Sequence, residues 1–308
     1  MPARTLVIAN PSSAGGATGR GWGPVEARLR AVLGPLDVAH TGGPRDAERI
    51  AREGVRAGAD RLVVAGGDGT LSEVVSGLLS AGLGSYAEIG VLPLGSGGDL
   101  ARSLGIPNGL EEALACIAGG KQRRIDAGRA RFAQGGREVT THFVNVASAG
   151  VSAPITRLVN RGSKLLGGRF AFALGAVRGL LQYRSPVLSA RLDGELLYQG
   201  PAVLVAAANG RTFGGGMQIA PEARPDDGLL DVVVVGDFSR ARLLRHLPAL
   251  YRGTHLGIPG VFSARGRRLE LEAAPGALGL ELDGEPLGFA PALVEVLPDA
   301  VTLLGPSA

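Results

Sequence analysis

The chain has 308 residues, of which 45% are hydrophobic and 19% are charged, and its formal net charge at pH 7 is +4. This composition excludes an intrinsically disordered chain and supplies enough apolar residues for about two domains. The 50 glycines have no Gly-x-y period, which excludes collagen, and a single cysteine excludes a disulfide framework or a cysteine-based zinc site.

In the first 125 residues, short β-branched runs alternate with glycine- or hydroxyl-rich turns and helical patterns. The runs are Thr5–Ala9, Leu36–Ala39, Leu62–Ala65 and Ile89–Leu94. The helical patterns after them end near Leu33, Ala57, Leu79 and Leu104. This alternation predicts a doubly wound, Rossmann-like parallel sheet. In such a sheet the loops at the carboxyl ends of the strands form the ligand site.

After Ile125 the pattern changes to strands with few helices between them, which predicts a β-rich second domain with antiparallel pairing. The expected strands are Thr140–Ala147, Leu188–Leu192, Ala202–Ala208, Leu230–Val235, Arg268–Glu272 and Leu293–Leu297. Two basic segments, Pro154–Tyr183 and Ser239–Tyr251, have helical patterns, and the apolar run Ala300–Leu304 is expected to return to the first domain. The predicted domains are therefore 1–127 with 300–308, and 128–299.

The loop Gly66-Gly-Asp-Gly-Thr70 stands between a predicted strand and a predicted helix. Its backbone N–H groups, its hydroxyl and the helix N-terminus favour a bound phosphate. The carboxylate of Asp68 would repel a phosphate unless Mg²⁺ or a sugar hydroxyl mediates. The alternative is a tight strand–helix turn with Thr70 as the helix cap. The loop is neither a Walker A motif nor the Rossmann G-x-G-x-x-G.

Four motifs follow one another at like positions in the first domain: Asn10-Pro-Ser-Ser-Ala-Gly, Thr41-Gly-Gly, Gly66-Gly-Asp-Gly-Thr and Leu92-Pro-Leu-Gly-Ser-Gly-Gly-Asp-Leu-Ala-Arg102. Later motifs are Phe143–Gly150, Asn209-Gly, Phe213–Gly216, Pro221–Asp231 and Leu282-Asp-Gly-Glu285. Taken together, these motifs resemble the diacylglycerol kinase catalytic-domain superfamily, specifically the bacterial soluble lipid kinases (diacylglycerol kinase- or sphingosine kinase-like). The resemblance covers essentially the whole chain.

The resemblance implies an ATP- and Mg²⁺-dependent kinase of phospholipid biosynthesis that phosphorylates a lipid hydroxyl. Its fold would be an α/β domain followed by a β-sandwich-like domain with inserted helices, with the nucleotide between them. The implied nucleotide contacts are Asn10, Thr41, Gly66, Gly67, Asp68, Gly69, Thr70, Leu71, Ser72, Glu73 and Ser96. Gly98 stands where the family usually has Asn, and this departure is expected to affect the order of the loop or the affinity for the nucleotide.

Three aspartates, Asp226, Asp227 and Asp231, surround Gly228. Oxygen ligands on a tight turn suit Mg²⁺, whereas the alternative is an Asp-Asp-Gly turn that caps the following strand. By the resemblance, Asp227 supplies a carboxylate, and Arg224 and Leu229 supply backbone carbonyls, to a metal that organises the site. Asp68 is the expected partner of the Mg²⁺ bound to the nucleotide.

The string Leu-Asp-Gly-Glu occurs twice, ending at Glu195 and at Glu285. Asp-Gly between strands predicts a hairpin turn for both copies. The resemblance implies that Glu285 takes the proton from the lipid hydroxyl, with Asp283 beside it, and that Asp193–Glu195 is an ordinary hairpin. The predicted catalytic residues are therefore Glu285, Asp283 and Asp68.

The two basic segments could lie on an anionic membrane surface, or their arginines could simply be solvated above a packed apolar face. The arginines and lysine concerned are Arg157, Arg161, Lys164, Arg169 and Arg178 in the first segment, and Arg240, Arg242, Arg245 and Arg252 in the second. No apolar run reaches the roughly 20 residues of a membrane span. We expect a cytoplasmic, peripherally membrane-associated lipid kinase that binds no nucleic acid. Two other functions stay open, namely an NAD kinase-like enzyme with a soluble substrate and a catalytically silent lipid- or nucleotide-binding regulator.

Overall fold

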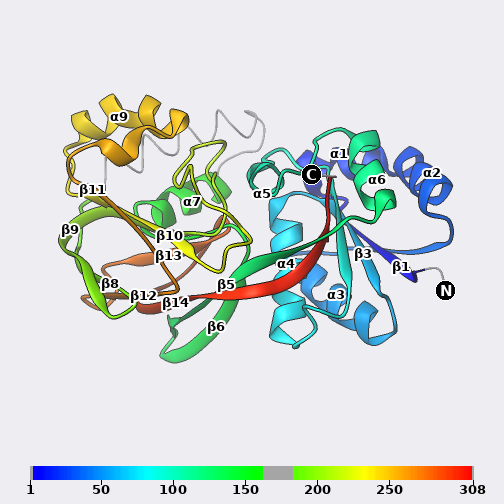
Figure 1. Ribbon diagram of the computed structural model, residues 1–308, viewed down its shortest axis with the longest axis horizontal. Coiled ribbons are helices and arrows are strands. Elements are labelled where there is room, and N and C mark those ends of the chain that lie inside the picture. The colour runs from blue at the N-terminus through cyan, green and yellow to red at the C-terminus, as the bar shows by residue number, and fades with distance from the viewer. Residues whose placement is uncertain (1–2, 162–182, 307–308) are drawn as a thin grey trace. The chain divides into compact units, whose positions relative to one another are not determined.

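The structure, a computed structural model, describes residues 3–161 and 183–306, which divide into two compact units (Figure 1). Unit 1 comprises Met1–Asp126 and Asp299–Ala308, and unit 2 comprises Ala127–Pro298. The sequence predicts the boundaries between the two domains after residues 127 and 299. The chain passes between the units within two strands, β5 (Gln122–Gln134) and β14 (Glu285–Leu304).

Unit 1 contains a parallel sheet with the strand order β14-β4-β3-β1-β2. Its strands are β1 (Thr5–Ala9), β2 (Leu36–His40), β3 (Arg61–Gly66), β4 (Glu88–Pro93) and the carboxyl end of β14. Each of the four apolar runs predicted as strands in the first 125 residues forms one of these strands. The mixed α/β, Rossmann-like character of this part of the chain is therefore confirmed.

Helices lie on both faces of the sheet in unit 1 (Figure 1). They are α1 (Ser13–Arg20), α2 (Trp22–Leu33), α3 (Asp46–Arg56), α4 (Asp68–Ser80), α5 (Asp99–Ser103) and α6 (Leu110–Gly119). The helices α2 and α6 share one apolar cluster with Val7 and Ala9 of β1. Leu6 of the same strand points to the other face, where it packs against Gly54 of α3. The short helix α1 and the helix α6 were not predicted.

Unit 2 is built from antiparallel strands, as predicted. They are β5, β6 (Arg137–Phe143), β7 (Val146–Gly150), β8 (Val187–Leu192), β9 (Glu195–Ala208), β10 (Leu230–Gly236), β11 (Val261–Gly266), β12 (Arg268–Ala273), β13 (Gly279–Leu282) and the first part of β14. The pairings β7-β9-β8-β12-β14-β13 return to β7 and form a closed circle. This circle encloses an apolar cluster that contains Phe143, Val205 and Leu269.

Three of the predicted strands in unit 2 have different bounds in the structure. The expected strand Ala202–Ala208 is the second half of β9, which has 14 residues. The expected strand Thr140–Ala147 is two strands, β6 and β7, which are separated at residues 144–145. The expected strand Leu293–Leu297 is part of β14, which continues for 20 residues. The strands β5, β11 and β13 were not predicted.

The described helices of unit 2 are α7 (Ser152–Arg161), α9 (Arg240–Arg252) and the 3-10 helix η2 (His255–Gly257). The first basic segment is helical over α7, and its remainder at 162–182 lies outside the described residues. The second forms α9, where Ser239 caps the helix because its Oγ accepts the Arg242 N–H. Within the described residues, no helix has the length and apolar character needed to cross a membrane.

Candidate active site

Two of the predicted nucleotide-binding residues meet at the carboxyl edge of the sheet in unit 1. Asn10 follows β1, and its Nδ2 donates to the Oγ1 of Thr70, 2.9 Å away. The same side chain accepts the Ser12 N–H through Oδ1, so its amide is held from both ends. Thr70 lies inside the first turn of α4, whose N-cap is Gly67. The alternative in which Thr70 caps the helix is therefore wrong.

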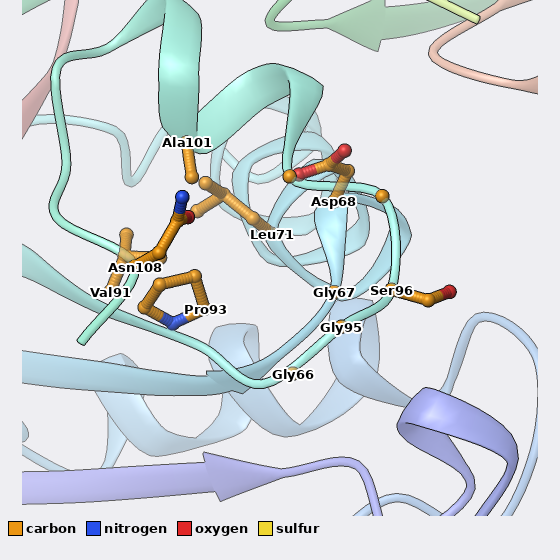
Figure 2. Close-up of a pocket in the computed structure, with 12 residues that line it drawn as sticks. Gly66, Gly67, Asp68, Leu71, Val91, Pro93, Gly95, Ser96, Ala101 and Asn108 are labelled. Carbon is orange, nitrogen blue, oxygen red and sulfur yellow. The ribbon is translucent and has the colours of Figure 1, made fainter. Parts of the chain in front are cut away.

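The glycine-rich loops after β3 and β4 line a pocket of about 260 Å³ (Figure 2). Its lining residues are Gly66, Gly67, Asp68, Leu71, Val91, Pro93, Gly95, Ser96, Gly97, Gly98, Ala101 and Asn108. The two loops touch backbone to backbone, because a Cβ on Gly95 would come within 2.4 Å of the Gly67 Cα. Only glycine permits this approach. Figure 2 shows Asp68 beside the loop of Gly95 and Ser96, with Asn108 and Pro93 across the pocket.

The carboxylate of Asp68 faces the first turn of α5. Its Oδ2 accepts the Asp99 N–H at 2.8 Å. Burial raises the pKa of Asp68, and the neighbouring Asp99 carboxylate adds to this rise, although backbone N–H groups of α5 oppose it. A divalent cation would relieve this crowding of negative charge. The carboxylate therefore fits a Mg²⁺ ion that takes its remaining ligands from phosphate oxygens and water.

Not every predicted nucleotide contact lines this pocket. The predicted contacts that line it are Gly66, Gly67, Asp68, Leu71 and Ser96.

Thr41 and Glu73 instead organise the neighbouring loop and helix. The Thr41 N–H donates to the Ala9 carbonyl at 2.9 Å. The Oε2 of Glu73 accepts the Ala47 N–H at the start of α3. Asn10, Gly69, Thr70 and Ser72 also lie outside the lining set. Asn10 follows β1, and the other three lie in the first turns of α4.

Asn108 lines the pocket and was missed by sequence reasoning. It follows Ile106-Pro107, beyond the end of α5, where no local pattern signals a ligand contact. It nevertheless lies close to Gly98, the position at which the chain departs from the family. A Cβ on Gly98 would be 3.7 Å from the Asn108 Oδ1, an ordinary van der Waals contact.

Replacing Gly98 by Asn should leave nucleotide affinity unchanged or tighter. Gly98 has φ +72° and ψ 20°, a left-handed conformation that Asn adopts more readily than other residues with a side chain. A β-branched Gly98→Val variant should instead lose about 1–3 kcal/mol of stability. Calorimetric titration with ATP and thermal melts of both variants test this. A severe loss of affinity in Gly98→Asn would mean that the loop has diverged to another geometry.

The predicted carboxylate ligand in unit 2, Asp227, is held by protein groups. Oδ1 of Asp227 accepts the Leu229 N–H at 3.1 Å, and its Oδ2 forms an ion pair with the Arg265 guanidinium. The Nε of Arg265 also lies 3.4 Å from Asp231. No group of three or more His, Cys, Asp or Glu side chains in the described ranges could hold a metal. Arg265 thus meets the carboxylate that the sequence assigns to a metal. The metal set Arg224, Asp227 and Leu229 stays a prediction.

Both Leu-Asp-Gly-Glu strings form two-residue hairpins, so this prediction is confirmed. Leu192 pairs with Glu195, and Leu282 pairs with Glu285. In both turns the Asp and the Gly have positive φ, 52° and 87° in the first and 47° and 87° in the second. These values are typical of a type I′ turn, which Asp-Gly favours. The two glutamates are exposed and begin long strands, β9 and β14.

The aspartates of the two turns have matching structural partners. Asp193 accepts the backbone N–H groups of Arg267 and Arg268. Asp283 accepts those of residues 144, 145 and 146 at 2.8, 3.0 and 3.0 Å. The carboxylate of Asp283, predicted as catalytic, therefore holds the connection between β6 and β7.

A buried carboxyl group that the sequence did not reveal lies behind the second turn. Glu281 of β13 is 5% exposed. Its Oε2 accepts the Ser148 hydroxyl at 2.7 Å, and its Oε1 accepts the Gly284 N–H at 2.5 Å. Burial, with a contribution from Asp283, raises the pKa of Glu281 to about 7. A lone Glu in the short run Gly-Leu-Glu-Leu gives no signal of burial.

This raised pKa predicts how stability changes with pH. The folded chain keeps the Glu281 proton up to about pH 7, whereas the unfolded chain releases it above about 4.5. Unfolding between these pH values therefore releases a proton, and the free energy of unfolding falls as pH rises. The loss is up to about 3 kcal/mol.

The Glu281→Gln variant lacks this titration. Its free energy of unfolding, relative to that of the native chain, should increase by that amount between pH 4.5 and 7.5. Urea unfolding of both proteins across the range measures the difference. A difference that does not vary with pH would contradict the prediction.

Comparisons with known proteins cover nearly the whole chain. Residues 4–130 match the family described as "Diacylglycerol kinase catalytic domain", and residues 145–305 match "YegS C-terminal NAD kinase beta sandwich-like domain". A "Probable lipid kinase YegS-like" from Chromohalobacter salexigens is 34% identical over 91% of this chain and 86% of its own length. A "Diacylglycerol kinase" from Mycobacterium tuberculosis is 30% identical over 98% of this chain and 95% of its own.

Solved structures show the same fold. A diacylglycerol kinase structure from Bacillus anthracis has a TM-score of 0.72 and 23% identity, over 98% of this chain and 97% of that one. An NAD kinase from Archaeoglobus fulgidus in complex with ATP has a TM-score of 0.54 and 12% identity, over 97% and 93%. The Rossmann-like first part and the β-sandwich-like second part are thus shared with both kinds of kinase.

Proposed function

The chain belongs to the family of diacylglycerol kinases and YegS-like lipid kinases, and from this we propose that it transfers the γ-phosphate of ATP to the hydroxyl group of a diacylglycerol-like or related lipid. The observation that carries the proposal is the pocket that the loops at Gly66–Asp68 and Gly95–Gly98 line together. The homologues that match over most of the chain are named lipid or diacylglycerol kinases, which favours a lipid over NAD as acceptor.

The glycine-rich loops would hold the phosphates of the nucleotide. The N-terminus of α4 begins at this pocket, and a helix N-terminus attracts anions through its dipole and free N–H groups. The bond between Asn10 and Thr70 would fix the shape of the loop around them. Asp68 would hold Mg²⁺ on the phosphates, where the ion neutralises charge on the group in transfer.

Glu285 would accept the proton of the lipid hydroxyl. The lipid oxygen bonds to the γ-phosphorus, and the bond from that phosphorus to the bridging oxygen breaks and releases ADP. The hydroxyl proton passes to the carboxylate. Glu285 suits this role because it is exposed at the first residue of β14, next to a turn that Asp283 and Glu281 hold in place.

Incubation with radiolabelled ATP, Mg²⁺ and a panel of lipids plus NAD tests the proposed reaction. A labelled lipid is the expected product, and its identity among diacylglycerol, phosphatidylglycerol and sphingoid bases defines the substrate. A labelled NAD product would favour the NAD kinase-like function. No labelled product at all would favour a silent lipid- or nucleotide-binding regulator.

We further propose that α9 brings the enzyme to an anionic membrane. None of its residues is buried, and its outer face exposes Leu244, Leu247 and Tyr251. Arg240 and Arg245 are exposed beside these apolar side chains. An apolar stripe flanked by arginines is the pattern of a helix that lies in a membrane interface.

Binding of the protein to anionic vesicles should weaken as salt rises, because exposed charges are screened over about 8 Å at physiological ionic strength. Charge reversal at Arg240 and Arg245 should reduce binding, and should lower activity on vesicles more than on detergent-dispersed lipid. Vesicle sedimentation and activity assays measure both effects. Charge reversal at two exposed arginines outside α9, Arg56 on α3 and Arg137 on β6, is the control, because it changes the net charge by the same amount. Equal binding to neutral and anionic vesicles without a salt effect would refute the proposal.

A further inference from the structure

A chain of buried hydrogen bonds connects α7 to the turn before Glu285. The hydroxyl groups of Ser152 on α7 and Ser148 on β7 lie 2.7 Å apart. Ser148 is bonded in turn to the Glu281 carboxyl, which accepts the N–H of Gly284 within the turn. All three side chains are less than 9% exposed. The turn is thus fixed from behind by polar groups that are almost fully buried.

The first hairpin of the repeated string has no such support. Its turn has nearly the same φ values, and its Asp binds backbone N–H groups in the same manner. The residue that corresponds to Glu281 is Arg191, which is exposed and lies 3.4 Å from the Gly194 carbonyl. The turn itself therefore does not need a buried carboxyl group. Glu281 therefore has a role at the second hairpin that the first hairpin lacks.

The buried carboxyl group is costly to keep. Removing a carboxylate from water is unfavourable even when it is well paired, and apolar residues of similar volume are often no less stable. Ionised Glu281 would also be repelled by the Asp283 carboxylate nearby. Fold stability alone therefore does not explain why a glutamate is buried at position 281. Control over the geometry of the turn explains it better.

We propose that Glu281 is a positioning residue for the phosphoryl transfer: by holding the Gly284 N–H, it sets the direction in which the chain leaves the turn and presents Glu285. This inference rests on the proposed function, in which Glu285 accepts the proton. A positioning role predicts a loss in kcat, because a small displacement of a catalytic group costs up to about 10²-fold.

The test compares Glu281→Leu, Glu281→Gln and the control Arg191→Leu in the full chain, with diacylglycerol in mixed micelles and ATP. Glu281→Leu should lower kcat about 10- to 100-fold while KM for ATP stays unchanged. Glu281→Gln should stay close to wild type, since its amide can still accept the Gly284 N–H and bond to Ser148. Arg191→Leu should have no effect. Wild-type kcat in a folded Glu281→Leu protein would overturn the proposal.

A double-mutant cycle separates this inference from the proposed function. If Glu281 acts through Glu285, Glu281→Leu should have no further effect in a Glu285→Gln background. If Glu281→Leu lowers kcat in the Glu285→Gln background as much as it does in the wild type, the positioning role is overturned. If Glu285→Gln alone is fully active, the proposed base is wrong and the inference fails with it. Should Glu281→Leu not fold, Ser148→Ala replaces it in the cycle, with a smaller loss in kcat expected and an unchanged kcat contradicting the inference.

Discussion

Glu285→Gln should lower kcat by about 10²–10⁴-fold, the usual contribution of a general base, while Glu195→Gln stays near wild type. The amide of Gln has nearly the size and hydrogen-bonding capacity of the carboxylate but cannot take the hydroxyl proton. ATP affinity should be roughly preserved, since the glycine-rich pocket belongs to unit 1 and Glu285 to unit 2.

The repeated string makes Glu195 an unusually close control. Both glutamates are exposed, both follow a type I′ turn, and both begin a long strand. A purely structural effect of the substitution should therefore be alike at the two positions, and under about 0.5 kcal/mol as for most surface changes. We would measure kcat, ATP affinity and Tm for both variants. Equal small effects would show that the catalytic role is misplaced, and a loss confined to Glu195 would assign it to the other hairpin.

The alternation of strands and helices in unit 1 could be predicted because β1, β3 and β4 are buried on both faces. Such strands have continuous β-branched runs bounded by glycine turns, and Leu62–Ala65 is one example. The structure extends that run by only one residue at each end, to β3. The runs also place the loops correctly, since parallel strands bring their carboxyl ends to one edge.

The division between β6 and β7 could not be predicted from local sequence. Val144 continues the apolar run and Val146 resumes it after Asn145, but the N–H groups of residues 144 and 145 donate to Asp283, well over a hundred residues later in the chain. The end of β6 is thus decided by a distant carboxylate. The same holds for Glu281, whose burial depends on Ser148 and Ser152 from other elements.

The motifs located the loops of the candidate site but not the partners of their side chains. Asp227, a predicted metal ligand, has an ion pair with Arg265 of β11 that its motif did not indicate. Glu73, a predicted nucleotide contact, accepts the Ala47 N–H at the start of α3, and the motif gave no sign of this bond. A charged side chain is placed by whichever long-range partner reaches it, and spacing within a motif carries no information about that partner.

Asp68→Asn should lower turnover by at least about 10²–10³-fold with the fold preserved, since it removes the negative charge that would hold Mg²⁺ on the phosphates. The Asn carbonyl oxygen can still accept the Asp99 N–H that Asp68 now accepts. Asp68→Ala should abolish turnover and also lose about 1 kcal/mol of stability, because the first turn of α5 then lacks its acceptor.

The difference between the two Asp68 variants separates charge from capping. Asp46→Asn is the matched control, because Asp46 also accepts a backbone N–H, that of Gly42, but does not line the pocket. We expect wild-type kcat for Asp46→Asn, and Tm values near wild type for both Asn variants. Full activity in a folded Asp68→Asn protein would show that the Asp68 charge takes no part in the reaction. Low activity in Asp68→Ala alone would then mean that the aspartate serves only to order α5 and the loop before it.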